Sequence, residues 1–148
     1  MAIGRSAGFT LLELLVVLVL MVLVYSMAAP MFSTAKPGME LKGAARQLAA
    51  GLRKARSQAV THKEPAALTL DLGERRFEVS GDKEIYRLPP TLDLTLFTAQ
   101  SEARRGQVGA IRFYPDGSST GGRVTLAVGQ RKTYVNVDWL TGHVTILE

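Results

Sequence analysis

The N-terminal part of this chain has a pattern that restricts how it can fold: a glycine, a short segment ending in one acid, and then a long stretch without charge. Gly8 is followed by Phe9-Thr10-Leu11-Leu12-Glu13, and no charged residue occurs from Leu14 to Ala29. A helix rises about 1.5 Å per residue, so this stretch can cross most of a hydrocarbon core of about 30 Å. We expect a transmembrane helix over residues 9–29, with the rest of the chain attached to it.

Glu13 is unusual because its carboxylate lies a few residues inside the apolar stretch. An ionised carboxylate there raises the free energy of insertion by about 2.5 kcal/mol or more, so it needs a partner. A local interpretation is a capping box, with Thr10 as the N-cap residue and Glu13 three positions later. The capping box explains where the helix starts. It does not explain why the apolar stretch begins directly after a glycine.

The segment Gly8-Phe9-Thr10-Leu11-Leu12-Glu13 and the apolar stretch behind it resemble the class III signal of type IV pilins and type II secretion pseudopilins. The resemblance implies that residues 1–8 are a leader, that prepilin peptidase cleaves between Gly8 and Phe9, and that the new amine of Phe9 is methylated. It also implies that Glu13 serves subunit assembly. A buried carboxylate is tolerated when a neighbouring subunit brings its cationic amine, here that of Phe9, within ion-pair distance.

The basic residues are concentrated just after the apolar stretch. The net charge is +5, and seven basic residues lie between Lys36 and Lys63, where Glu40 is the one acid. A solvated helix face is the simplest interpretation, and contact with anionic lipid headgroups or with nucleic acid are the alternatives. No aromatic residue is interleaved to stack on bases. The candidate residues for a partner or an anionic surface are Arg46, Arg53, Lys54 and Arg56.

A helical pattern covers residues 39–62. Its apolar residues recur in alternating steps of four and three, which places them on one stripe. They are Leu41, Ala45, Leu48, Leu52, Ala55 and Ala59. We expect a break at residues 36–38 and a stop at Pro65. Gly43 and Gly51 each weaken the helix by up to about 1 kcal/mol, so tertiary packing has to hold it.

From Ala66 onward the apolar residues alternate with a period of two, which predicts strands. The expected strands cover residues 68–72, 77–79, 84–88, 92–98, 111–114, 123–128, 133–139 and 144–147, with a polar loop at 100–109. A long helix followed by short strands predicts an α+β fold, in which antiparallel β-sheets over residues 66–148 pack against the helix stripe. Residues 30–148 then form one domain outside the membrane.

The segment from Phe113 to Gly122 has the composition of a turn between two strands. Together with Ala55-Arg56-Ser57-Gln58-Ala59-Val60 in the predicted helix, it resembles minor pseudopilins of the GspH family and their pilus relatives FimT and FimU. A phosphate or calcium site fits poorly, because no Lys-Ser/Thr pair follows the glycines and the single acid, Asp116, cannot supply six to eight oxygen ligands. We expect a structural turn, with a contact to a partner as the second interpretation.

Few residues in the chain are suited to catalysis. It has two histidines and no cysteine, so disulfides and thiolate metal sites are excluded. Neither His62 nor His143 has an acid or a serine placed beside it by sequence spacing. We expect no enzymatic activity, no cofactor and no metal.

The resemblance implies a minor pseudopilin, a structural subunit of the periplasmic pseudopilus that supports export of folded proteins across the outer membrane. The chain would be a single-pass protein of the bacterial inner membrane with its C-terminal domain in the periplasm. Its implied partners are prepilin peptidase, the inner membrane, and other pseudopilins, major and minor, bound through the N-terminal helix. The alternative is a minor pilin of a type IV pilus, similar to FimT and FimU, with nucleic acid as a partner during DNA uptake.

Overall fold

The computed structural model describes residues 8–33, 36–98 and 107–148, with the side chains of residues 27–33 and 36 outside the description. The chain divides into two compact units, residues 1–36 and 37–148. The expected leader lies outside the described residues except for Gly8. Residues 100–106 of the expected polar loop also lie outside the described residues. For residues 27–29 of the expected membrane segment, the backbone is described and the side chains are not.

The first unit contains helix α1, Leu11–Ser33. The helix begins after Thr10, whose Oγ1 accepts a hydrogen bond of 3.2 Å from the backbone amide of Glu13. This bond satisfies one of the free amides of the first turn, and it confirms the Thr10 half of the predicted capping box. The helix continues through Pro30 to Ser33.

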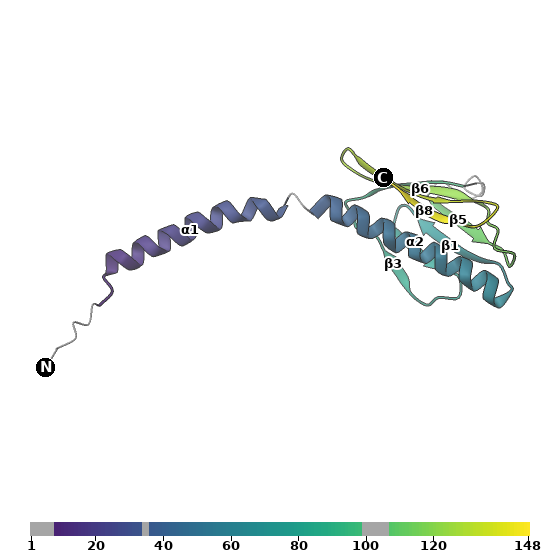
Figure 1. The fold of residues 1–148 in the computed structure, drawn as a ribbon, viewed down its shortest axis with the longest axis horizontal. Coiled ribbons are helices and arrows are strands. Elements are labelled where there is room, and N and C mark those ends of the chain that lie inside the picture. Colours follow the sequence, from purple (N-terminus) through teal and green to yellow (C-terminus); the bar gives the residue numbers. More distant parts are fainter. Residues whose placement is uncertain (1–7, 34–35, 99–106) are drawn as a thin grey trace. The chain divides into compact units, whose positions relative to one another are not determined.

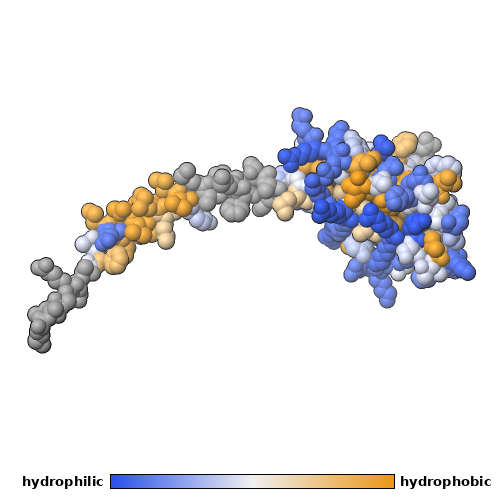
Figure 2. Space-filling model, viewed as in Figure 1, coloured by the Kyte–Doolittle hydropathy of each residue, from blue (hydrophilic) through white to orange (hydrophobic). Residues whose placement is uncertain are grey.

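Apart from Glu13, the surface of α1 from Leu11 to Tyr25 is apolar on all sides. Each apolar side chain from Leu11 to Tyr25 is between 46% and 85% exposed. Figure 2 shows mostly apolar surface over the visible face of this part of the helix, with a hydrophilic patch near its N-terminal end. Within the described parts of the chain, no helix is both long and apolar enough to cross a membrane.

Helix α2 covers Lys36–His62, and all of it except Lys36 belongs to the second unit. The break expected at residues 36–38 is wrong, because Pro37 lies in the first turn, where its missing amide hydrogen costs no helical bond. The helix ends at His62, before the stop expected at Pro65, because Lys63 adopts a left-handed φ of 55°. All six residues of the expected apolar stripe are at most 3% exposed, so the stripe prediction is confirmed.

The strands of the second unit form two four-stranded sheets. The first has the order β3-β2-β1-β5, with β1 at Ala66–Asp71, β2 at Arg76–Val79, β3 at Ile85–Arg87 and β5 at Val108–Phe113. The second has the order β4-β6-β7-β8, with β4 at Asp93–Phe97, β6 at Gly122–Val128, β7 at Arg131–Val137 and β8 at Val144–Leu147. Every neighbouring pair is antiparallel, which confirms the predicted α+β class.

Strand β5 begins three residues earlier than expected, at Val108 instead of Ile111. The expectation treated Gly109 as part of the loop. The structure buries Gly109 in the strand, where an added Cβ would lie 2.4 Å from Leu96 Cδ2. The glycine therefore allows the Leu96 side chain of β4 to approach the backbone of β5 closely.

The core of the second unit lies between α2 and the sheets, and Figure 1 shows α2 running alongside them. Leu48 and Leu52 of the helix and Phe77 of β2 are at most 1% exposed, and Val124 of β6 is fully buried. Burying each such side chain contributes about 1.5–3 kcal/mol. The packing of these residues holds the buried face of α2 against the sheets.

We expect Gly51→Ala to lower the free energy of unfolding and Gly43→Ala to raise it. Alanine gains about 0.5–1 kcal/mol of helix propensity at either site. At Gly51 a Cβ would lie 2.7 Å from Phe77 Cε2 and 3.0 Å from Leu68 Cδ1, and both of these side chains are at most 1% exposed. Overpacking of about 1–3 kcal/mol then outweighs the gain. At Gly43 no atom in the described part of the chain lies within 4 Å of an added Cβ.

Urea unfolding of both variants in detergent micelles, followed by circular dichroism, compares the two glycines directly. A stabilising effect of similar size at both positions would contradict the packing of α2 on β1 and β2.

Candidate functional site

The residues at the expected leader cleavage site are accessible. Gly8, Phe9 and Thr10 precede the first residue of α1, and Phe9 is 81% exposed. Among the described residues, no atom lies within 4 Å of a Cβ placed on Gly8. An exposed backbone outside a helix is the kind of segment that a peptidase can bind.

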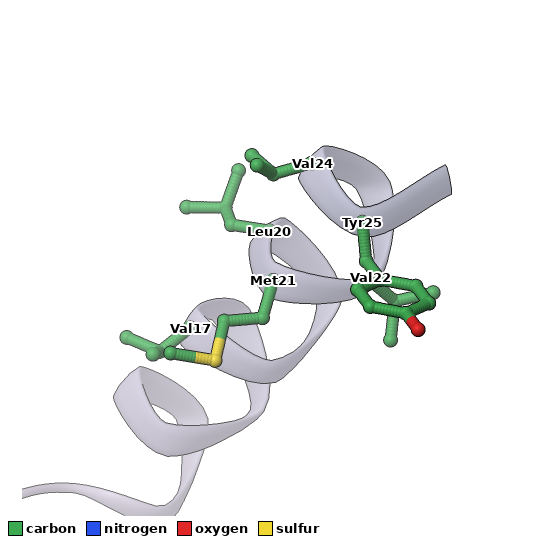
Figure 3. Close-up of a pocket in the computed structure, with 6 residues that line it drawn as sticks. All are labelled: Val17, Leu20, Met21, Val22, Val24 and Tyr25. Atoms are coloured by element: carbon green, nitrogen blue, oxygen red, sulfur yellow. The ribbon is translucent and has the colours of Figure 1, made fainter. Parts of the chain in front are cut away.

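The first turn of α1 places Glu13 at the start of an apolar helix surface. Glu13 is exposed, and the helix has no basic residue in its last turn. An open hollow further along α1 is formed by side chains that project outward from the helix (Figure 3). They are Val17, Leu20, Met21, Val22, Val24 and Tyr25. A helix that is apolar on all sides is stable when it is surrounded by lipid or by other apolar helices.

The basic candidates on α2 do not form one continuous free surface. Lys54 forms an ion pair with Asp82, Arg53 Nη2 donates to the Val144 carbonyl at 3.3 Å, and Arg56 donates to two loop carbonyls. Arg46 is exposed and makes no hydrogen bond or ion pair within the described residues. Three of the four candidates are therefore bonded within the chain.

Lys54 joins α2 to the turn between β2 and β3. Its Nζ donates to Asp82 Oδ2, and the Tyr86 hydroxyl donates to the same oxygen at 2.9 Å. These two donors hold the pKa of Asp82 at about 2, below its ordinary value of 3.8, with the Lys54 bond as the larger cause. The hydrogen bond to Asp82 also raises the pKa of Lys54.

This contact makes stability depend on pH. Because the folded-state pKa of Asp82 is depressed, its contribution is present above the unfolded value near 3.8 and is lost as the pH falls through about 2. We expect Asp82→Asn to lower the urea midpoint at pH 5, and we expect the difference from the natural chain to shrink as the pH falls toward 2. Lys54→Met removes the same ion pair and should show the same convergence. A difference that stays constant over this range would contradict the role of Asp82.

Arg56 connects α2 to two turns that are far apart in the sequence. Its Nε donates to the carbonyl of Gly117 at 3.4 Å and to the carbonyl of Thr141 at 3.2 Å. A Cβ on Gly142 would lie 2.2 Å from the Gly117 oxygen, so the two turns are in direct contact. The structure thus brings together the two segments on which the GspH resemblance was based, one around Arg56 and the other around Gly117.

The first of these turns is held by its own polar groups. Asp116 Oδ1 accepts hydrogen bonds from the Ser118 backbone amide at 3.0 Å and from the Ser118 hydroxyl at 2.6 Å. These bonds lower the pKa of Asp116. The Asp116 carboxylate therefore has a structural use, in agreement with the turn interpretation. Among the residues that the structure describes, no three His, Cys, Asp or Glu side chains are grouped closely enough to hold a metal ion.

The second turn follows β7 and begins earlier than the connection expected between the strands at 133–139 and 144–147. Strand β7 ends at Val137, so the expectation of a strand through Trp139 is wrong. Asp138 Oδ1 accepts hydrogen bonds from the amides of Leu140 and Thr141 and from the Thr141 hydroxyl, all within 3.0 Å. The Thr141 amide is the largest cause of a lowered Asp138 pKa. The pattern Asp-x-x-Thr before Gly142 is a turn signal that places the start of this turn at Asp138.

The sequence resembles one described family along most of its length. Residues 44–141 match the family described as Type II transport protein GspH, and residues 3–29 match the Prokaryotic N-terminal methylation motif. Type II secretion system protein H of Xanthomonas campestris pv. campestris is 36% identical over 137 residues, which are 93% of this chain and 80% of that protein.

Two solved structures share the fold. The minor pseudopilin EpsH from the type 2 secretion system of Vibrio cholerae has a TM-score of 0.58 at 15% identity, over 73% of this chain and 96% of its own. The type IV minor pilin FimU of Pseudomonas aeruginosa has a TM-score of 0.56 at 16% identity, over 74% of this chain and 89% of its own. At such low identities these two structures establish the fold alone.

Proposed function

The chain belongs to the GspH family of type II transport proteins, and we propose that it enters the periplasmic pseudopilus through α1 and Glu13. It is a minor pseudopilin of the type II secretion system, and it interacts with other pseudopilins of that system. The family is structural, so the proposal assigns the chain no reaction, cofactor or metal.

The observation that carries the proposal is an acid in the first turn of a helix that is otherwise apolar on all sides. The apolar side chains of α1 are at least 46% exposed from Leu11 to Tyr25, so they are available to lipid and to the helices of other subunits. Within such a bundle an unpaired carboxylate is costly. The amine of a neighbouring subunit's Phe9, left free after cleavage, can neutralise Glu13.

We further propose that prepilin peptidase cleaves between Gly8 and Phe9 and that Phe9 is then methylated. Two observations support this: the methylation motif spans residues 3–29, and Phe9 is 81% exposed ahead of the helix. The mature chain would cross the inner membrane once over residues 9–29 and place residues 30–148 in the periplasm. The basic residues after the helix favour the opposite orientation, but long domains translocate largely regardless of their charge.

The proposal is tested by deleting the gene in its own host and assaying three activities: exoprotein release into the medium, pilus-dependent motility and DNA uptake. Each assay is repeated with a plasmid copy of the natural gene. We expect loss of exoprotein release, with motility and uptake intact, and full recovery with the plasmid.

The opposite result would assign the chain to a type IV pilus. Normal exoprotein release in the deletion strain, with loss of motility or uptake, would contradict the secretion role and favour a minor pilin similar to FimU.

A further inference from the structure

A groove lies between α2 and the turn after β7, and the assembly proposal makes no use of it. One wall consists of the α2 side chains Arg53, Arg56, Ser57, Val60 and Thr61, and the other consists of residues 142–144. The α2 positions follow the spacing i, i+3, i+4, i+7 and i+8, so they lie on one face of the helix. This face is adjacent to the buried stripe and is fixed by the packing of that stripe.

The groove is rich in hydrogen-bond donors and positively charged. Among the residues that the structure describes, its lining includes two guanidinium groups and no acid. Arg53 uses one Nη2 bond for the Val144 carbonyl, and Arg56 uses Nε for the two turn carbonyls. A guanidinium carries five N–H groups, so most donors of both side chains remain for a ligand. The hydroxyls of Ser57 and Thr61 add further donors along the same face.

One arginine is already held in place before any ligand binds. The Arg56 side chain is only partly exposed, and its Nε is bonded to both turns at 3.2–3.4 Å. A side chain that is ordered in advance loses less conformational entropy on binding. The backbone carbonyls that hold Arg56 are neutral, so its charge stays uncompensated within the groove.

The composition of the groove favours a carboxylate on a polypeptide over a phosphate on nucleic acid. Val60 is 44% exposed, and Val144 is buried beneath the groove, so an apolar surface adjoins the arginines. Binding to nucleic acid requires several cations along a track. On α2 this track is interrupted, because Lys54 is paired with Asp82 and Lys42 is paired with Glu148 at 2.9 Å.

We propose that this groove binds an Asp or Glu side chain on an extended segment of a neighbouring pseudopilin. Its carboxylate accepts hydrogen bonds from Arg53 and Arg56, and an adjacent apolar side chain of the same segment contacts Val60. The geometry of guanidinium groups matches carboxylates by paired hydrogen bonds, which gives such a contact its specificity. This inference rests on the proposed function, because the pseudopilus supplies the neighbour.

The test uses full-length chains in the deletion strain and takes advantage of the absence of native cysteine. Thr61→Cys places one thiol in the groove, and single cysteines replace a residue adjacent to each periplasmic Asp or Glu in the co-expressed pseudopilins, so that each acid is kept. We expect disulfide crosslinking to one acidic segment. Arg53→Glu should reduce this crosslink about tenfold or more, and Arg46→Glu, the same charge change on the same helix outside the groove, should leave it unchanged. Changing the partner's acid to Arg should restore the crosslink in the Arg53→Glu variant, because the two charges are then exchanged and again opposite.

Several outcomes would overturn the inference. The first applies if deletion of the gene abolishes exoprotein release but the Arg53→Glu variant keeps normal release and normal crosslinking. The secretion role would then hold, and the groove would not be needed for it. Another is an absence of crosslinks to every acidic segment while a cysteine at Arg46 does crosslink. A third is binding of the purified chain to labelled single-stranded oligothymidine that falls tenfold with Arg53→Glu and not with Arg46→Glu, which would assign the groove to nucleic acid.

Discussion

Replacing Gly142 with alanine should destabilise the sheet unit by about 3 kcal/mol or more, one of the largest effects expected of any single substitution in the chain. Gly142 has a φ of +64°, where a side chain costs about 1–2 kcal/mol by itself. A Cβ there would also lie 2.2 Å from the Gly117 carbonyl oxygen and 2.9 Å from Arg56 Nε. The backbone of one turn would have to separate from the other, and Arg56 would lose the geometry of both its hydrogen bonds.

Gly129 provides the matched control. Its φ of +58° is nearly the same, but no atom of a described residue lies within 4 Å of an added Cβ. Gly129→Ala should therefore cost only the backbone strain, about 1–2 kcal/mol. Urea unfolding of both variants separates strain from crowding. Equal losses at the two positions would mean that the two turns are not in contact through Gly142 and Arg56.

The features that the sequence predicted well are those set by local periodicity. The apolar stripe of α2 follows from the spacing of Leu41, Leu48 and Leu52, because only one face of a helix can enter the core. The alternation at Leu68 and Leu70 likewise determines which side of β1 is buried. The direct sequence signal for the start of α1 is Thr10, since an N-cap acts within its own turn.

The features that the sequence could not predict depend on contacts between distant segments. Lys54 and Asp82 are 28 residues apart, and Arg56 and Thr141 are 85 apart, so no periodicity relates them. The basic residues of α2 therefore looked like one charged face, although most of them are bonded within the chain. Gly109 was assigned to a loop because its place in β5 also depends on a distant contact. The Leu96 side chain of β4 approaches it closely.

Replacing Glu13 with leucine should reduce incorporation into pseudopili about tenfold or more while leaving leader cleavage and membrane insertion intact. If the carboxylate pairs with a neighbour's Phe9 amine, its removal leaves that amine buried without a partner, which costs about 3–5 kcal/mol in a low-dielectric bundle. Incorporation is measured by shearing pseudopili from cells that overproduce them and comparing chain content by immunoblot. The intact mass of the membrane-bound chain reports cleavage. Glu64→Leu, at an exposed acid outside α1, is the control.

The direction of the Glu13→Leu effect distinguishes assembly from insertion. Leucine at this position removes a charge that costs about 2.5 kcal/mol or more in lipid, so the variant should enter the membrane at least as well as the natural chain. A defect in pseudopili cannot then be attributed to poor anchoring. Glu13→Asp keeps the charge on a shorter side chain and should keep part of the incorporation. Normal incorporation of Glu13→Leu would contradict the ion pair, since a helix that needs only apolar contacts should assemble better without the acid.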